Sequence, residues 1–336
     1  MPRRTATRRC QPPEAGAGTS RQGREHAAVI ESQRRLLGDR VRNAAFAAAI
    51  AKAIQPGRTR VADLGTGTGF LAILCERAGA KSVWACDLDP GVVKLAKRTC
   101  ADNGAKKVKL VHGHSTNLAP PEAVDLIVSE TLGHFAGEEH MLESLADAQR
   151  WMAPGGRTIP TRVEQFLCPV TGDAVQRGID SFADHQGVNL GAARRIALSN
   201  GYVRTVAPAD LLEGGRAAQR IDRMDFPGDT QSRRRGTAAW TLPGGAVHGL
   251  ALWWEADLWE GIMLSTSPLA PETHWEQIYL PLQQPLAAKA GDRLEVELRL
   301  DTRFEAGCTA HWSGRLVRGG KAVASFAQDN RTGAML

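Results

Sequence analysis

The first half of the chain alternates strand-like apolar runs with helix-like stretches. The strand-like runs are Arg60–Leu64, Ser82–Cys86, Lys107–His112 and Val124–Ser129. Helical periodicity occurs in Leu71–Ala78 and Gly91–Asn103, and also in an alanine-rich lead-in, His26–Ile54, which has no capping residue and ends before Pro56. Strands that alternate with helices typically form a parallel sheet with helices on both faces. The pattern therefore predicts an α/β domain.

The second half has a different pattern, which begins after Pro154-Gly155-Gly156, interpreted here as a turn. From about residue 160 the chain contains short runs in which apolar and polar residues alternate. These runs include Ala246–Ala256, Gln277–Leu282, Arg293–Leu300 and Thr309–Val317. Alternation with a period of two predicts an antiparallel β domain. The polar, helix-like stretch Asp180–Asp222 is interpreted as an arm inserted into this domain.

Length and charge refine this picture. The chain has 336 residues, 43% of them hydrophobic, enough for one large or two ordinary domains with their own cores. The net charge is +6, but residues 1–24 hold six arginines and a single acid, so the remainder is almost neutral. We therefore expect a flexible, solvated basic tail and no specific nucleic-acid binding.

Membrane and metal functions find no support in the sequence. No apolar run approaches the roughly 18 to 20 residues of a membrane-spanning helix, and no apolar stretch follows the N-terminal arginines as in a secretory signal. The six cysteines lack the spacing of a zinc site and the density of a disulfide framework. They are Cys10, Cys75, Cys86, Cys100, Cys168 and Cys308. We expect a cytoplasmic protein with reduced thiols, no membrane association and no metal.

A glycine-rich turn, Gly65–Gly69, joins the first strand to the next helix. Glycines let the backbone approach a ligand closely, and a helix N-terminus offers free N–H groups. The dinucleotide-binding fingerprint requires a further glycine where Phe70 stands, which disfavours nicotinamide and flavin cofactors. Asp87, at the end of the second strand, is placed to accept hydrogen bonds from a ribose diol. The alternative is a tight turn without a ligand, with the acid capping the helix that begins at Asp89-Pro90.

Two further segments carry candidate chemistry. The fourth strand runs into a loop with Glu130 and, nine positions later, Glu139. Ligands of such sheets bind beyond the carboxyl ends of the strands, so Glu130 is placed in the ligand crevice. The alternatives are a capping acid and a solvated helix residue, or Glu138 as the partner of Glu130. Thr273-His274-Trp275 lies far downstream, and its histidine, taken alone, is more often structural than catalytic.

Together these segments resemble the protein arginine methyltransferase family. Gly65–Gly69 is similar to motif I of class I S-adenosylmethionine-dependent methyltransferases, Glu130 and Glu139 to the family's double-glutamate loop, and Thr273–Trp275 to its THW loop. Leu36–Arg42 resembles the helical segment that precedes motif I. The resemblance implies a Rossmann-like methyltransferase domain with N-terminal helices (residues 26–160) after the tail (1–25). A β-barrel domain (161–336) follows, with a helical dimerisation arm at about 180–205.

The resemblance also implies residue roles. The cofactor would be S-adenosylmethionine, with Arg42 on its carboxylate. The remaining cofactor-binding positions would be Asp63, Gly65, Gly67, Asp87, Ser115 and Thr116. Glu130 and Glu139 would grip the substrate guanidinium, and drawing its charge toward the gripped nitrogens makes the remaining nitrogen more nucleophilic. His274, paired with Asp39, would receive the proton released after methyl transfer.

Several positions depart from the family pattern. Gly23–Ala28 lacks the usual tyrosines, and other residues replace a methionine, an aromatic residue, an adenine-binding acid and a glutamate pair: Leu36, His134, Thr116 and Arg34-Arg35. We expect a homodimeric arginine N-methyltransferase acting on arginine in protein. The alternative substrate is free L-arginine or another small guanidino metabolite. A non-catalytic cofactor-binding protein is disfavoured, because nothing would then preserve two desolvated carboxylates.

Overall fold

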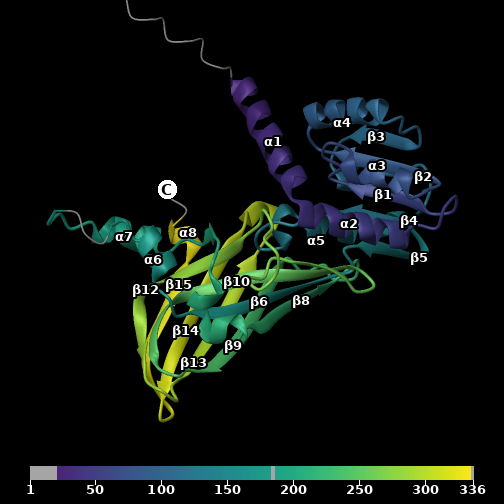
Figure 1. Ribbon diagram of the computed structural model, residues 1–336. Coiled ribbons are helices and arrows are strands. Elements are labelled where there is room, and N and C mark those ends of the chain that lie inside the picture. The colour runs from purple at the N-terminus through teal and green to yellow at the C-terminus, as the bar shows by residue number, and fades with distance from the viewer. Residues whose placement is uncertain (1–20, 183–185, 334–336) are drawn as a thin grey trace, which may run out of the picture.

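Five parallel strands form the centre of the first domain in the computed structural model, which describes residues 21–182 and 186–333 (Figure 1). Their order across the sheet is β3-β2-β1-β4-β5. Their bounds are β1 Arg60–Leu64, β2 Ser82–Asp87, β3 Val108–His112, β4 Val124–Ser129 and β5 Met152–Ile159. In β1, Val61, Ala62 and Leu64 are all buried, as expected for a central strand covered on both faces. The predicted α/β Rossmann-like fold is confirmed.

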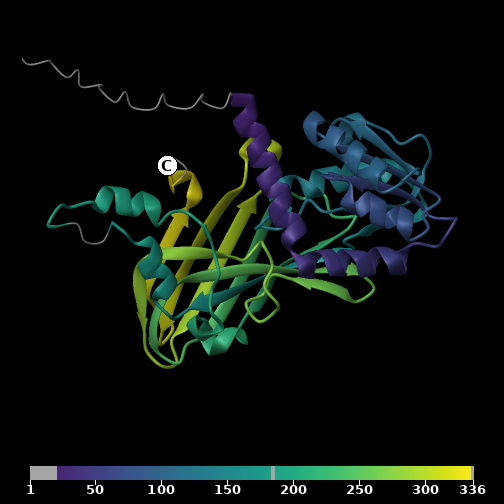
Figure 2. The same ribbon diagram turned by 45° about the horizontal axis from the view of Figure 1, so that its top comes forward.

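Helices precede and connect these strands. They are α1 Arg21–Gly38, α2 Arg40–Ala53, α3 Phe70–Arg77, α4 Pro90–Asp102 and α5 Met141–Ala148. The predicted lead-in is therefore two helices, and α1 extends away from the start of α2 (Figure 2). The prediction that this segment lacks a cap was wrong, because Asp39 caps α2 by accepting the Arg42 N–H at 2.9 Å. Residues 1–20 of the predicted tail lie outside the described residues, and the last residues of that segment are helical.

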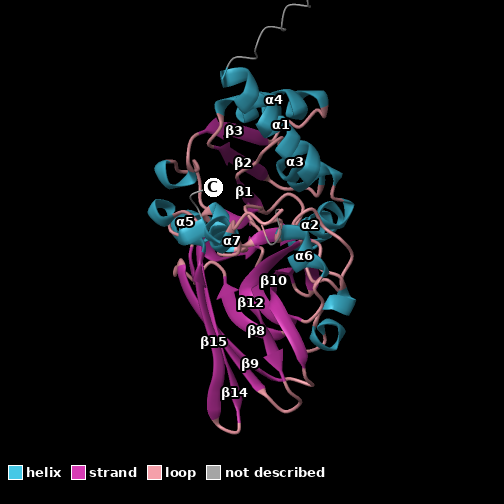
Figure 3. Cartoon of the chain, turned by 90° about the vertical axis from the view of Figure 1, so that its left-hand side faces the viewer, coloured by secondary structure: helices cyan, strands magenta, loops and turns pink. Residues whose placement is uncertain are grey.

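Two antiparallel sheets build the second domain and confirm the predicted β domain with its barrel-like arrangement (Figure 3). One has the order β7-β12-β10-β6-β8 with β11 beside β10, and the other the order β15-β14-β13-β9. The first sheet contains β6 Arg162–Val170, β7 Tyr202–Arg204, β8 Gln219–Asp225, β10 Gly245–Trp259, β11 Ile262–Ser265 and β12 Gln277–Ala288. The second contains β9 Arg233–Thr241, β13 Arg293–Asp301, β14 Thr309–Arg318 and β15 Lys321–Asp329.

Two local predictions were wrong. Pro154-Gly155-Gly156 lies inside β5, where a shift in its register with β4 accommodates Gly155 at a φ of 77°. The stretch Asp180–Asp222 is largely not α-helical, because Tyr202–Arg204 pairs with β12 as an edge strand and β8 begins at Gln219. Its α-helix is α7, Gly191–Ala197. Short helices α6, Ala174–Ile179, and α8, Asn330–Gly333, flank this domain.

The hydrophobic core continues from one domain into the other. Trp254, Trp259 and Trp275 of the β domain belong to the same buried cluster as Leu64 and Leu132 of the parallel-sheet domain. A second cluster fills the β domain itself. The domains therefore meet through packed aromatic side chains, and this junction lies beside the candidate site described below.

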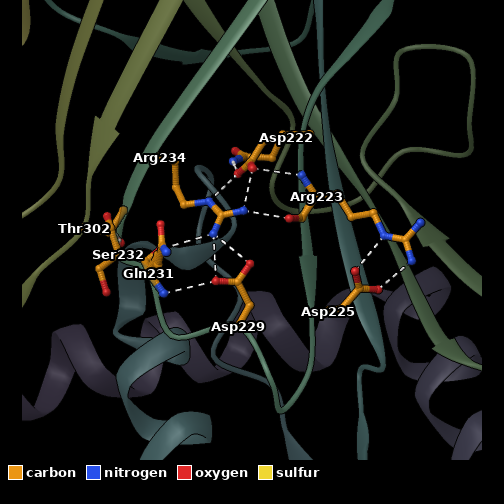
Figure 4. Close-up of polar contacts among 9 residues, drawn as sticks. Asp222, Arg223, Asp225, Asp229, Gln231, Ser232, Arg234 and Thr302 are labelled. Carbon is orange, nitrogen blue, oxygen red and sulfur yellow. Dashed lines mark hydrogen bonds and ion pairs between the residues drawn. The ribbon is translucent and has the colours of Figure 1, made fainter.

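Arg234 fixes the connection between β8 and β9, the edge strands of the two sheets of the β domain (Figure 4). Its Nε donates to Asp222 at 2.9 Å and its Nη1 to Asp229 at 2.8 Å, and all three side chains are largely buried. Two carboxylates compensate the desolvated guanidinium. Ser232, in the same connection, donates to Glu143 of α5, so this connection is tied to the first domain.

No helix within the described residues is long and apolar enough to cross a membrane. The described part of the chain also holds no cluster of His, Cys, Asp and Glu suited to a metal ion.

Candidate active site

A cavity of about 570 Å³ opens at the carboxyl ends of β1, β2 and β4 and is bordered by the last turns of α1 and by the 273–275 segment. It brings together most of the residues predicted from the sequence. Those that line it are Arg42, Gly65, Gly67, Asp87, Glu130, Glu139 and His274. Residues separated by more than 230 positions thus share one site.

The glycine turn lines one side of the cavity. Gly65 and Gly67 have φ values of 70° and 55°, in the left-handed region that favours glycine. A Cβ at Gly67 would lie 2.8 Å from Gln33 Oε1, so the side chain of α1 sits directly over the turn. Asp87 accepts the N–H of Gly67 at 3.0 Å. Asp89, not Asp87, caps α4, which leaves Asp87 at the cavity.

Three predicted cofactor residues do not line the cavity. Asp63 is buried below the glycine turn, where it accepts the Thr66 hydroxyl at 2.6 Å, and burial raises its pKa to about 7. Through this bond to Thr66, Asp63 stabilises the glycine turn from the side opposite the cavity. Ser115 and Thr116 lie in a short 3₁₀ turn whose carbonyls receive the Arg150 guanidinium. The structure does not bring these two residues to the other predicted positions.

Glu130 is held by a buried ion pair with Arg42, which was not predicted from the sequence. Arg42 Nε donates to Glu130 Oε2 at 2.8 Å, and Arg42 Nη2 donates to the same oxygen. Asn43 accepts from Arg42 Nη1 at 2.7 Å. Burial raises the pKa of Glu130, and the guanidinium opposes that rise. Arg42 therefore both lines the cavity and pairs with Glu130, one of the two glutamates expected to bind the substrate guanidinium.

Of the two adjacent glutamates, the structure places Glu139 in the cavity. Its carboxyl is accessible from the cavity. Desolvation by the surrounding protein is the largest cause that raises its pKa to about 7, and repulsion from Glu130 and Glu138 adds to the rise. Glu138 turns back into its own loop and accepts the N–H groups of His134 at 2.7 Å and Phe135 at 3.3 Å. The alternative pairing of Glu130 with Glu138 is therefore not what the structure shows.

The loop from Glu130 to Glu139 is fastened by two indoles of the β domain. Trp275 Nε1 donates to the Leu132 carbonyl at 2.6 Å, and Trp254 Nε1 donates to the Gly133 carbonyl at 3.0 Å. His134 Nδ1 donates to the Trp275 carbonyl at 2.7 Å. Trp254 and His134 were not predicted as site residues, and Glu138 was considered only as an alternative partner of Glu130. Only the neighbouring THW segment gave a hint, through the position of Trp275.

Asp39 and His274 form the predicted pair. Asp39 Oδ2 lies 2.9 Å from both His274 Nδ1 and the His274 backbone N. Burial acts to raise the pKa of Asp39, but hydrogen bonds from His274 and from the Arg42 N–H outweigh it and lower the pKa. A carboxylate only accepts, so Nδ1 carries a proton and Nε2 is the ring atom left for a ligand. One aspartate therefore both caps α2 and orients the histidine.

The fold and this site define the class of protein: a Rossmann-like methyltransferase with an acidic acceptor pocket. A family model described as a methyltransferase domain matches residues 61–156, and one described as an arginine methyltransferase oligomerization subdomain matches residues 162–305. The chain is similar to protein arginine N-methyltransferase 6 of Xenopus laevis, with 32% identity over 242 residues, 67% of this chain and 70% of that protein. It belongs to the protein arginine N-methyltransferase family.

Other relatives agree with this assignment. Probable protein arginine N-methyltransferase 6.1 of Oryza sativa subsp. indica is 26% identical over 325 residues, 84% of each chain. The solved Trypanosoma brucei PRMT1 enzyme–prozyme heterotetrameric complex with AdoHcy matches with a TM-score of 0.77 and 22% identity, over 88% of this chain and 96% of that chain. Arabidopsis thaliana protein arginine methyltransferase 10 matches with a TM-score of 0.75 and 22% identity, over 89% and 97%. The solved structures show the same fold.

Proposed function

We propose that this chain transfers a methyl group from S-adenosylmethionine to a guanidino nitrogen of arginine in protein. The observation that carries the proposal is the single cavity in which a glycine turn and Asp87 face Glu130, Glu139 and the Asp39–His274 pair. The first group suits a nucleoside with a charged tail, and the second suits a cation. Relatives named protein arginine N-methyltransferase support the same activity.

The cavity residues fit the cofactor. Gly65 and Gly67 leave the backbone open to close approach, and the Asp87 carboxylate can accept from a ribose diol. Arg42 retains N–H groups beyond those given to Glu130 and Asn43, and these can meet a carboxylate. S-adenosylmethionine, when bound, supplies an electrophilic sulfonium methyl group. Ser115 and Thr116 have no part in this assignment.

Glu130 and Glu139 act on the acceptor. A guanidinium stays protonated at any physiological pH, so it must be oriented and polarised rather than deprotonated first. Two carboxylates that accept its N–H groups draw its positive charge toward the gripped nitrogens. Positioning of the remaining nitrogen then accounts for much of the acceleration. The Arg42–Glu130 pair and the two indole bonds keep the carboxylates in place for this task.

The Asp39–His274 pair takes the proton that methylation releases. The aspartate fixes Nδ1 as the protonated nitrogen, so His274 Nε2 is the acceptor toward the cavity. The negative Asp39 stabilises the imidazolium that forms.

Radiolabelled methyl transfer tests the proposal. The full chain should label an arginine-containing peptide and leave the same peptide with lysine in place of arginine unlabelled. Calorimetric binding of S-adenosylmethionine checks the donor half separately. Donor binding with no labelling of any guanidino compound would contradict the assigned acceptor.

We also propose that the enzyme is a cytoplasmic homodimer. The oligomerization subdomain model that matches residues 162–305 supports association. The free thiols of Cys75, Cys86, Cys100, Cys168 and Cys308 support a reducing compartment. Light scattering of the purified chain and fractionation of cells that produce it are the respective tests.

A further inference from the structure

Arg35 brings an unpaired positive charge into a cavity otherwise suited to cations. It lines the same cavity as Glu130 and Glu139, and its side chain is exposed there. Within the part of the chain that the structure describes, its hydrogen bond is a long one, from Nη2 to the His274 carbonyl at 3.4 Å, and it makes no ion pair. Most of its five N–H donors are therefore available to a ligand.

Within the described residues, no neighbouring carboxylate forms a direct ion pair with Arg35. Glu31, one turn earlier on α1 and also at the cavity, is bound by Arg34 through Nε at 2.7 Å and Nη2 at 2.5 Å. Both oxygens of Glu31 are therefore engaged by Arg34, and Glu31 acts on Arg35 only through space, so the N–H groups of Arg35 remain open to another carboxylate. A bidentate guanidinium of this kind recognises carboxylate groups.

Arg35 is also close to Glu130 and Glu139, the two carboxylates that we call the guanidinium clamp. His274 lies between them: its carbonyl accepts from Arg35, and its ring lies near enough to Glu130 to influence the pKa of that carboxyl. A substrate held by Glu130 and Glu139 therefore extends past His274 toward Arg35 if its chain follows the cavity wall. A positive group at that point would be repelled, and a carboxylate would be bound.

We infer that Arg35 selects substrates in which a carboxylate accompanies the target guanidino group. This inference rests on the proposed function and narrows its substrate class. The carboxylate can be an acidic residue next to arginine in a protein or the α-carboxylate of free arginine. Either source forms the same ion pair with Arg35. Arginine-rich, purely basic segments lack the carboxylate and are therefore disfavoured as substrates.

Calorimetry tests the inference without turnover. The full chain, saturated with S-adenosylhomocysteine, is titrated with peptides of equal length in which one arginine is flanked by glutamates or by lysines. We expect the acidic peptide to bind at least about ten-fold more tightly, a ratio typical of one charge-assisted contact. Arg35→Ala should reduce that ratio to a few-fold, and Arg35→Lys should restore part of it.

Arg40→Ala is the matched control. It removes the same charge from an exposed position outside the cavity, so it should leave the ratio unchanged. L-arginine and agmatine, which lacks the carboxylate, then distinguish the two sources. A preference of the wild type for L-arginine that Arg35→Ala abolishes assigns the free amino acid, and selectivity confined to the peptides assigns a protein substrate.

The outcomes separate this inference from the proposed function. Equal or tighter binding of the basic peptide, or an acidic preference that persists in Arg35→Ala, overturns the role of Arg35 even if methyl transfer occurs. Arg35-dependent binding of the acidic peptide without methyl transfer to any of these compounds upholds the recognition and overturns the proposed reaction.

Discussion

Replacing Glu139 with glutamine should lower activity by an amount that depends on pH. The surrounding protein, together with Glu130 and Glu138, raises the pKa of Glu139 to about 7. Only the ionised carboxylate polarises the substrate, whereas glutamine keeps the shape without the charge. Above pH 7 the wild type holds the charge that the variant lacks. As the pH falls through 7, the wild-type carboxyl gains a proton and becomes similar to the variant.

The magnitude follows from these two states. Loss of one electrostatic stabiliser lowers kcat/KM by about 10²-fold, so wild type and Glu139→Gln should differ by that factor near pH 9. One pH unit below its pKa, roughly a tenth of a carboxyl is ionised, so the difference should shrink to about ten-fold at pH 6. The pH dependence of kcat/KM reports groups of the free enzyme. Ionisable groups other than Glu139 are present in both proteins, so their effects cancel in the ratio.

Initial rates of radiolabelled methyl transfer, at saturating S-adenosylmethionine and low peptide concentration, measure this ratio from pH 6 to pH 9. Glu138→Gln is the control, because its amide oxygen can still accept the His134 N–H. Glu138 contributes to the raised pKa of Glu139, so this variant should keep most of its alkaline activity and retain it to lower pH. A wild-type to Glu139→Gln ratio that is constant over the range refutes the charge argument. A Glu138→Gln variant as inactive as Glu139→Gln refutes the assignment of the clamp.

Three further variants probe the other parts of the site. Asp87→Ala should weaken S-adenosylmethionine binding by roughly 2 to 4 kcal/mol in calorimetry, through loss of charge-assisted bonds, and unchanged affinity would remove Asp87 from the donor site. Asp39→Asn keeps one oxygen to cap α2 but turns its amide nitrogen toward the two His274 N–H groups, so kcat should fall by about 10²-fold and the melting temperature should also fall. Asp39→Ala, which loses the cap as well, should lose about 1 kcal/mol more stability. Trp275→Phe leaves the buried Leu132 carbonyl without its donor and should cost about 1 to 3 kcal/mol in urea unfolding; an unaltered unfolding curve would show that another group replaces the indole.

Local sequence patterns were sufficient for most of the fold. The strands that surround the glycine turn are short apolar runs between turn residues, and their type and order were predicted because burial on both faces leaves little choice of residue. The stretch Asp180–Asp222 was mispredicted because its polar residues suit an exposed helix, whereas pairing of Tyr202–Arg204 with a distant strand decides its structure. Asp39 was recognised as a partner of His274 but not as a cap.

The site was predictable only where it follows from strand ends and motifs. Glu130 and Asp87 were placed correctly in the crevice because the carboxyl ends of parallel strands meet there. The Arg42–Glu130 ion pair and the bond from Trp254 to Gly133 join residues 88 and 121 positions apart, and no local pattern encodes such contacts. Ser115 and Thr116 were assigned by family position alone, and neither residue lines the cavity.

Because of the indole bonds to Leu132 and Gly133, mutations in different parts of the gene are expected to affect different halves of the cavity. The donor half of the cavity depends on the turns after β1 and β2, whereas the shape of the acceptor loop depends on tryptophans encoded 121 and 143 codons further on. Missense alleles in the later region are expected to produce proteins that still sequester the methyl donor while turning over slowly.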